Sequence, residues 1–342
     1  MMSVILFIGI ALVIAYNFTN GFQDAGDIIA TAIASHAMPP SAAIFVVTLF
    51  TFIGPMTGGI AVANTIGQFV VMAGQPHGVA EKVVLAALAS GATYNVLSYI
   101  FGLPNSSTSS LASGLIGSAL VALGAEHIHW GFAAVWSGHI TGFMAIVIGV
   151  FFSPLVGFLM GIAMIKLMKL LLCRLTVKAE VLLMASQYLS VAWLAYGHGT
   201  NDAQKGMGML AMLLLAMGIY PSLTIPLWVV LLCSLSIAVG TMFGGWRIIR
   251  TIGFGLYKIR LIHSVTDQVS SSAVIWASSM LGIPVSATQV VTATLMGVGA
   301  GERPRHVKWG TAFAILGGWL LNIPFCIMCG ACYYALLKVM LP

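Results

Sequence analysis

Charged side chains are scarce in this sequence. It has 14 Lys and Arg residues and 8 Asp and Glu residues among 342, or 6% charged, whereas a soluble domain carries about 25%. Hydrophobic residues make up 60% of the chain, and its mean hydropathy is +1.04. No soluble surface can be built from this composition. It predicts a single domain embedded in a lipid bilayer.

No cleavable signal peptide is expected at the N-terminus. The N-terminal run MMSVILFIGIALVIAYNF has no basic region before it and no small-residue cleavage site, so we expect it to be the first membrane segment. About ten apolar stretches follow one another, five before a basic linker and five after it, and a membrane helix needs roughly 20 such residues. The expected fold is an all-α polytopic membrane protein.

Motifs for catalysis and for tight metal binding are missing. The sequence contains no His-Glu-x-x-His run and no nucleophile with a matched base. Cys326, Cys329 and Cys332 share one face of an apolar segment without a second ligand pair, which favours helix packing over zinc. The histidines near 126–129 lie in a loop, where a surface role is expected. We therefore predict no enzyme activity and no cofactor.

The basic residues indicate orientation in the membrane instead of nucleic-acid binding, although the net charge is +6. Loops 247–260 and 303–308 carry several Lys and Arg residues, whereas their equivalents at 68–80 and 123–128 carry none. Because Lys and Arg accumulate on the cytoplasmic side, this bias predicts two halves of inverted orientation. The basic loops and the linker from Lys166 to Lys178 are then cytoplasmic, and the N-terminus is outside.

Two motifs occur twice in the same order. GFQDAGD at 21–27 aligns with GTNDAQK at 199–205, an offset of 178, and GLPNSSTSS at 102–110 aligns with GIPVSATQV at 282–290, an offset of 180. Nearly equal offsets indicate duplication. The predicted organisation is a first membrane repeat, a basic cytoplasmic linker and a second membrane repeat, at residues 1–165, 166–180 and 181–342.

Interrupted helices are expected within each half. The acidic motifs are rich in glycine, which would permit a break that frees backbone carbonyls for a cation, at Gly21, Gly26, Gly197, Gly199 and Gly206. The stretches 269–283 and 286–299 are short for a span, and a Pro-Val-Ser-Ala-Thr turn joins them. They predict either a re-entrant hairpin or two crossings of the membrane. The same alternatives hold for the equivalent pair of the first half, around 104–110.

Four charged residues of the duplicated motif are flanked by apolar sequence on both sides: Asp24, Asp27, Asp202 and Lys205. A carboxylate at mid-membrane costs at least about 2.5–3.5 kcal/mol, so it usually marks an ion or substrate route. We predict that these residues bind or couple a cation; the alternative is a helix cap in an interfacial loop. Lys205 could form a structural pair with Asp27, replace a coupling cation permanently, or titrate, and His198 has no counterpart in the first half.

Hydroxyl clusters form the second half of the expected site. Hydroxyl and amide donors would gather at helix N-termini after two prolines and could bind a tetrahedral oxyanion from opposite sides, at Ser106, Ser107, Thr108, Ser286 and Thr288. The alternative is that these residues only cap helices. Gln23 and Asn201 could donate to the same anion or could hydrogen-bond between helices.

At these residues the chain resembles the inorganic phosphate transporter (PiT) family over nearly its full length. The Gly-x-x-Asp core of the duplicated signature is present at Gly21 and Asp24, and GHGTNDAQKGMG at 197–208 is similar to the bacterial branch. The resemblance implies that Asp24 and Asp202 bind the coupling cation and that the five hydroxyl residues hold phosphate. Two departures concern the coupling ion. The family histidine is replaced, by Ser109 and Gln289, and its paired asparagines are replaced, by Asp27 and Lys205.

The resemblance implies a secondary active transporter that moves inorganic phosphate with sodium or protons by alternating access, with sodium at Asp24 and Asp202 as one option. Some bacterial members carry a neutral metal–phosphate complex. Alternatives are a permease for sulfate or another tetrahedral oxyanion, and an anion channel. The expected partners are phosphate, the coupling cation and the lipid bilayer, with a homo-oligomer as an option. The expected location is the inner membrane of a bacterium, crossed several times.

Overall fold

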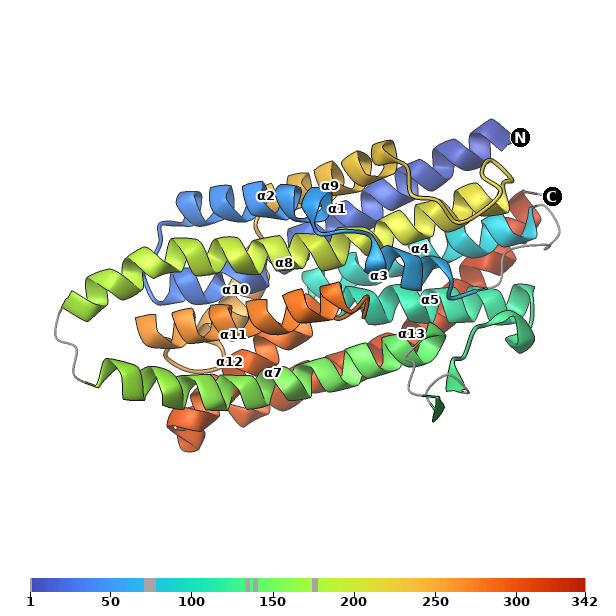
Figure 1. The fold of residues 1–342 in the computed structure, drawn as a ribbon. Helices are drawn as coiled ribbons and strands as arrows, with labels where there is room; N and C mark the ends of the chain where they lie inside the picture. Colours follow the sequence, from blue (N-terminus) through green and yellow to red (C-terminus); the bar gives the residue numbers. More distant parts are fainter. Residues whose placement is uncertain (1, 71–77, 133–135, 138–140, 174–177, 342) are drawn as a thin grey trace.

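The computed structural model describes residues 2–70, 78–132, 136–137, 141–173 and 178–341. Within these ranges the regular secondary structure is helical, apart from one isolated bridge between Val70 and Ile128. The helices pack side by side into an elongated bundle, with the N- and C-termini at the same end (Figure 1).

The helices of the two halves follow the same order. The first half contains α1 (Met2–Ala34), α2 (Pro40–Thr57), α3 (Ala61–Gly67), α4 (Val79–Ile100), α5 (Ser107–Ala122), the short η1 (Ala125–His127) and α7 (Gly142–Leu172). The second half contains α8 (Lys178–Ala216), α9 (Leu227–Met242), α10 (Trp246–Ile249), η2 (Arg250–Phe254), α11 (Leu261–Met280), α12 (Ala287–Glu302), the short η3 (Pro304–His306) and α13 (Trp309–Met340).

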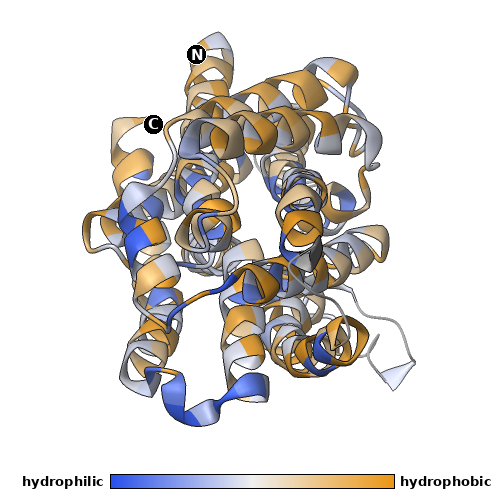
Figure 2. Ribbon diagram, turned by 90° about the vertical axis from the view of Figure 1, so that its left-hand side faces the viewer, coloured by the Kyte–Doolittle hydropathy of each residue, from blue (hydrophilic) through white to orange (hydrophobic). Residues whose placement is uncertain are grey.

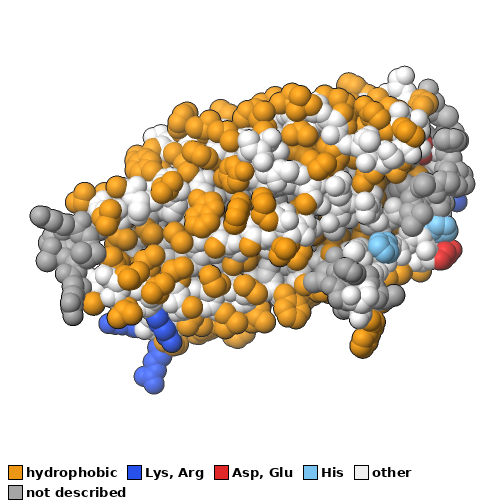
Figure 3. Space-filling view, in the orientation of Figure 1, with side chains coloured by type: hydrophobic (Ala, Val, Ile, Leu, Met, Phe, Trp, Pro, Cys, Tyr) orange, Lys and Arg blue, Asp and Glu red, His pale blue; other side chains and the backbone are white. Residues whose placement is uncertain are grey.

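The surface of the bundle is that of a membrane protein. Five helices of the described chain are long and apolar enough to cross a bilayer, namely α1, α2, α4, α7 and α13, and a sixth if α9 and the bent segment Trp246–Phe254 count as one span. Hydrophobic colouring dominates the helices seen end-on (Figure 2), and hydrophobic side chains are spread along the whole visible flank, with few charged side chains among them (Figure 3). The predicted polytopic all-α membrane fold is confirmed.

Equivalent helices of the two halves run in opposite directions. α1 begins at the end that carries the N-terminus, whereas its counterpart α8 begins at the opposite end (Figure 1). The packing is reciprocal as well: α1 packs on α9 and α8 on α2, while α5 packs on α13 and α12 on α7. Helices of each half therefore pack against helices of the other half, and this reciprocal packing supports the predicted inverted repeat.

Two hairpins turn near the middle of the bundle. α4 ends there and α5 leads back to the same end, and α11 and α12 do the same from the other end (Figure 1). The bends contain Gly102 at φ +66° and Gly282 at φ +69°, a backbone region that only glycine enters at little cost. Of the two predicted alternatives, re-entrant hairpins or paired crossings, the structure has the hairpins.

The expected interruption at the glycine-rich acidic motifs is wrong. α1 and α8 are continuous through both motifs, so their backbone carbonyls stay in helical hydrogen bonds. The glycines allow close helix packing instead: a Cβ on Gly21 would lie 2.1 Å from the carbonyl oxygen of Ile237, and one on Gly199 would lie 2.3 Å from that of Thr51. The helix breaks lie in the hairpins and between α9 and α10.

The connection between the halves is shorter than the predicted linker at 166–180. α7 continues to Leu172 and α8 begins at Lys178, and residues 174–177 of the predicted linker lie outside the described ranges. Residues 71–77, most of the first-half loop that lacks Lys and Arg, lie outside them too.

A cluster of charges joins three helices at the end of the bundle where α7 stops. Glu302 contacts Lys169 at 2.6 Å and Arg260 at 2.6 Å, and it also contacts His263. Burial alone would raise the pKa of Glu302, but the hydrogen bonds from these three side chains outweigh it and lower the pKa to about 2. The carboxylate is therefore ionised at all physiological pH values and ties α12 to α7 and α11.

Replacing Glu302 by Gln should lower the free energy of unfolding at pH 7 by about 2 kcal/mol. The pKa shift from 4.5 to about 2 sets an upper limit of about 3.4 kcal/mol at about 1.36 kcal/mol per pKa unit, and solvent screening by the exposed partners Lys169 and Arg260 reduces it. Because the folded pKa lies below the ordinary value of 4.5, this stabilisation is present above that value and is lost as the pH falls through about 2. Thermal melting in detergent between pH 7 and pH 3 measures it. The exposed Glu126→Gln is the matched control, and equal melting of both variants at pH 7 would contradict the assignment.

Candidate functional site

The predicted site residues meet in the centre of the bundle, where α1 and α8 pass the tips of the two hairpins. All eleven are at most 3% exposed, so the site is closed to solvent in this structure. They are Gln23, Asp24, Asp27, Ser106, Ser107, Thr108, Asn201, Asp202, Lys205, Ser286 and Thr288.

On one side, the hydroxyl of Thr288 contacts both carboxylates of α1. Its Oγ1 lies 2.8 Å from Asp24 Oδ1 and 2.5 Å from Asp27 Oδ2. The two aspartates share one face of α1 because they are three residues apart. The remaining oxygens, Asp24 Oδ2 and Asp27 Oδ1, are buried without a hydrogen-bond partner among the described residues.

On the other side, Asp202 and Lys205 of α8 form a buried ion pair. Lys205 Nζ lies 2.9 Å from Asp202 Oδ1, and both side chains are fully buried. Asn20 donates to Asp202 Oδ2 at 3.0 Å, and the hydroxyl of Ser107 lies 3.3 Å from both that oxygen and the Lys205 ammonium. Lys205 thus pairs with Asp202, one turn away on its own helix.

His198 joins the two sides. Its Nδ1 lies 3.8 Å from Asp24 Oδ2 and 3.9 Å from Asp202 Oδ2. One ligand atom from each of the three residues falls within 4.8 Å of the others, so Asp24, His198 and Asp202 could together hold a cation. Both ring nitrogens lack a hydrogen-bond partner in the described structure, which leaves them free for such a ligand.

The hairpin hydroxyls divide into two kinds. Ser106 and Ser286 cap α5 and α12, since their side chains accept from the backbone N–H three residues on, at 3.1 and 3.4 Å. Thr108 donates to the carbonyl of Val285 at 2.7 Å, so the two hairpin tips touch. Capping, the alternative to anion binding, describes Ser106 and Ser286 in this structure.

Gln23 and Asn201 occupy equivalent positions and make equivalent bonds. Gln23 donates to Ser98 Oγ at 3.2 Å and to the Leu103 carbonyl at 3.4 Å. Asn201 donates to Ser279 Oγ at 3.1 Å and to the Ile283 carbonyl at 3.4 Å. Both amides thus hydrogen-bond to the bends of the hairpins. This is the interhelical hydrogen bonding expected from the sequence as the alternative to phosphate binding. Contact with a phosphate stays a prediction for both.

Two buried polar residues near the site were missed from the sequence. Asn20 fell outside the motif, although it lies one turn before Asp24 on the same face of α1. Asp267 lies in α11, is fully buried, and interacts electrostatically with Asp27. The available signal for Asp267 was its rarity, as one of eight acidic residues, and the run of three serines that follows at 270–272.

Comparisons with known proteins identify the family of the chain. The model of the phosphate transporter family matches residues 20–330, which is most of the chain. The chain belongs to this family. Membership confirms the resemblance seen in the sequence and the expectation of a transporter and not an enzyme.

Curated members of the family match over nearly the full length. A low-affinity inorganic phosphate transporter of Rhizobium meliloti is 35% identical over 95% of both chains, and one of Bacillus subtilis is 33% identical over 99% of both. A solved structure titled as the sodium-dependent phosphate transporter has the same fold, with a TM-score of 0.85 over 99% of this chain and 100% of that one, at 22% identity.

Proposed function

We propose that the protein is a secondary active transporter of inorganic phosphate, coupled to sodium ions or protons, with alternating access around the central site. The observation that carries the proposal is a reciprocal contact. The α12 tip of the second half reaches the acids of the first half through Thr288, and the α5 tip of the first half reaches Asp202 of the second half through Ser107. Family membership and the names of the relatives support phosphate as the substrate.

The anion would bind between the N-termini of α5 and α12. The first N–H groups of a helix have no partner within it and carry partial positive charge, which suits an oxyanion. The fully buried ammonium of Lys205 lies 3.3 Å from Ser107 Oγ at the start of α5. It would add a full positive charge without any coupling ion, so we assign Lys205 the role of a tethered cation in the second half.

The coupling cation would bind at the acids of α1. Thr288 has one hydroxyl proton, so it can donate to Asp24 or to Asp27 but not to both. Its two short contacts therefore need a proton on one carboxyl or a cation between the oxygens. Asp24 and His198 offer further unpartnered ligand atoms next to this position. Neutralising these charges would allow phosphate to approach the neighbouring helix N-termini.

The closed site fits a carrier better than an anion channel. A channel needs a continuous polar pore, whereas the predicted site residues are buried and the hairpin tips touch through Thr108. A rocking motion of the two interlocked halves would open the site to one side at a time. Sulfate has the same shape but no proton at neutral pH, so the nearby carboxylates favour phosphate.

Uptake of labelled phosphate into proteoliposomes tests the proposal. We expect saturable uptake that an inward sodium or proton gradient accelerates and that excess sulfate inhibits little. Empty liposomes provide the control. Uptake that does not saturate, or that ignores both gradients, would overturn the carrier mechanism, and stronger inhibition by sulfate than by unlabelled phosphate would overturn the substrate.

A further inference from the structure

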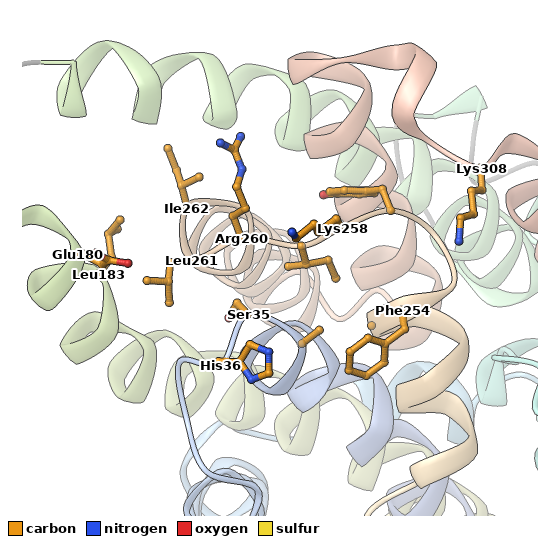
Figure 4. A pocket seen from close by; sticks show the side chains of 14 residues that line it. Ser35, His36, Glu180, Leu183, Phe254, Lys258, Arg260, Leu261, Ile262 and Lys308 are labelled. Carbon is orange, nitrogen blue, oxygen red and sulfur yellow. The ribbon is translucent and has the colours of Figure 1, made fainter. Parts of the chain in front are cut away.

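A cavity of about 900 Å³ opens at the end of the bundle that carries the charge cluster of Glu302. Its walls come from the end of α1, the start of α8, the η2 segment and the start of α11, and we name it the basic vestibule because Lys258, Arg260 and Lys308 line it (Figure 4). Leu261 and Ala34 also line this cavity. Both of these residues belong to helices that continue to the central site.

A chain of buried hydrogen bonds leads inward from the vestibule. Gln187 donates to the carbonyl of Leu261 at 3.5 Å and accepts from Ser264 at 3.1 Å. Gln268 then donates to Ser264 at 3.2 Å and to Thr31 at 3.2 Å. Except for Leu261, which lines the cavity, these residues are fully buried.

Asp267 and Asp27 complete this chain at its inner end. Thr31 interacts with the Asp267 carboxylate, and it lies one turn from Asp27 on the same face of α1. Ser271 donates to Asp267 Oδ1 at 3.4 Å, while Asp267 Oδ2 is buried without a partner among the described residues. Asp267 lies six residues into α11 from Leu261, or about 9 Å at 1.5 Å per residue. It therefore lies between the vestibule and the acids of α1.

The repeat shows that this polarity is not required by the fold. With the offsets of the duplicated motifs, the counterparts of Asp267 and Gln268 in α4 are Ala87 and Leu88, and the counterpart of Thr31 in α8 is Met209. The remaining counterparts are apolar too, at Gly9, Val84 and Gly91 for Gln187, Ser264 and Ser271. The first half packs the equivalent place with apolar residues. Burying an acid and two amides there in the second half costs free energy, and helix packing alone does not require it.

We propose that Asp267 is a further cation-binding residue of the transporter, through which the coupling cation passes between Asp27 and the basic vestibule. The inference rests on the proposed function, since it needs a coupling cation. The ligand is a monovalent cation, either a proton carried on the carboxyl or a sodium ion held by it and by the hydroxyls of Thr31 and Ser271. Buried acids of this kind mark ion pathways in membrane proteins.

No cation of the protein occupies this position in the described structure. The charged or titratable groups on Asp267's own helix and on the helices packed against it are His263 on α11, Tyr16, Asp24 and Asp27 on α1, Glu180, Tyr188, Tyr196, His198, Asp202 and Lys205 on α8, Lys166 and Lys169 on α7, and Glu302 on α12. Tyr257, a lining residue of the vestibule, also interacts electrostatically with Asp267 and carries no positive charge. Lys205 is paired with Asp202, and Lys169 with Glu302. Asp267 is thus left with Asp27 as the charged group that acts on it, which favours occupation by a mobile cation.

Net uptake and exchange separate this role from a structural one. Net uptake needs the cation to leave at the vestibule, whereas exchange of internal for external phosphate at equal concentrations needs only the loaded carrier to reorient. We expect Asp267→Asn to lower gradient-driven net uptake by at least about tenfold, as for loss of a proton or ion relay, and to leave exchange within about twofold of the unmodified protein. Asp267→Glu should restore part of the net uptake. Ser272→Ala is the matched control, because Ser272 lies one turn from Gln268 and, among the described residues, hydrogen-bonds only to its carbonyl.

The two sources of the cation are distinguished by the gradient. If the ligand is a proton, Asp267→Asn abolishes the response to a pH gradient; if it is sodium, the variant abolishes the response to a sodium gradient. Net uptake that is unchanged in Asp267→Asn would overturn the proposal, and so would net uptake and exchange that fall together in both the Asn and the Glu variants. Failure of the unmodified protein to exchange phosphate would instead overturn the proposed function.

Discussion

Asp202→Asn is expected to abolish phosphate transport and to destabilise the protein, because it leaves the ammonium of Lys205 buried without a charged partner. Lys205 Nζ lies 2.9 Å from the carboxylate, and neither side chain is exposed. Breaking a buried pair by removing one partner costs about 3–5 kcal/mol. Thermal melting of the purified protein in detergent and uptake by proteoliposomes measure the two effects.

The double variant Asp202→Asn/Lys205→Met distinguishes the ion pair from other causes. Replacing both partners removes the unpaired charge, so most of the lost stability should return. Transport should not return, since the positive charge beside the start of α5 is also gone. If Asp202→Asn alone melted at the same temperature as the unmodified protein, the pairing of Lys205 with Asp202 would be contradicted.

Asp24→Asn is also expected to lose transport, but, unlike Asp202→Asn, it should keep its stability. The amide preserves the shape of the side chain and can still contact Thr288, while the substitution removes one of two neighbouring buried carboxylates. Losing a charged ligand worth about 2 kcal/mol or more corresponds to at least about thirtyfold weaker cation binding. We expect gradient-driven uptake to fall by at least that factor.

Melting and uptake of Asp24→Asn should be compared with those of Asp202→Asn under the same conditions. The two residues occupy equivalent positions in the repeat, so a symmetric site predicts equal effects on stability. The asymmetry introduced by Lys205 predicts a large loss of stability for Asp202→Asn and little loss of stability for Asp24→Asn. Full uptake by Asp24→Asn with unchanged coupling would show that this carboxylate does not bind the coupling cation.

The residues of the site could be predicted from the sequence because the repeat contains each motif twice. Equal offsets of the acidic and hydroxyl motifs indicated that Asp24 and Asp202 are equivalent and that each half contributes one hairpin, and the structure brings these elements together. The offsets could not predict which side chains of the two halves contact each other. Thr288 contacts the acids of α1 because α12 crosses to the other half, and nothing local in either sequence specifies that crossing.

The sequence misled where a residue type has two physical uses. Glycine permits a break in a helix, but it also permits two helices to approach closely, and Gly21 and Gly199 serve the second purpose. Asp267 was missed for a related reason. It lies in the polar break before an apolar stretch, where an acid is expected to face water, and only the fold shows that it is fully buried.

Simultaneous measurement of phosphate and cation entry into the same proteoliposomes tests the central claim most directly. Labelled phosphate reports one flux, and either labelled sodium or an internal pH-sensitive dye reports the other. The proposed mechanism predicts that one of the two cations enters with phosphate at a fixed ratio, and that Asp24→Asn abolishes both fluxes together. Saturable phosphate entry with neither cation moving would contradict coupled transport.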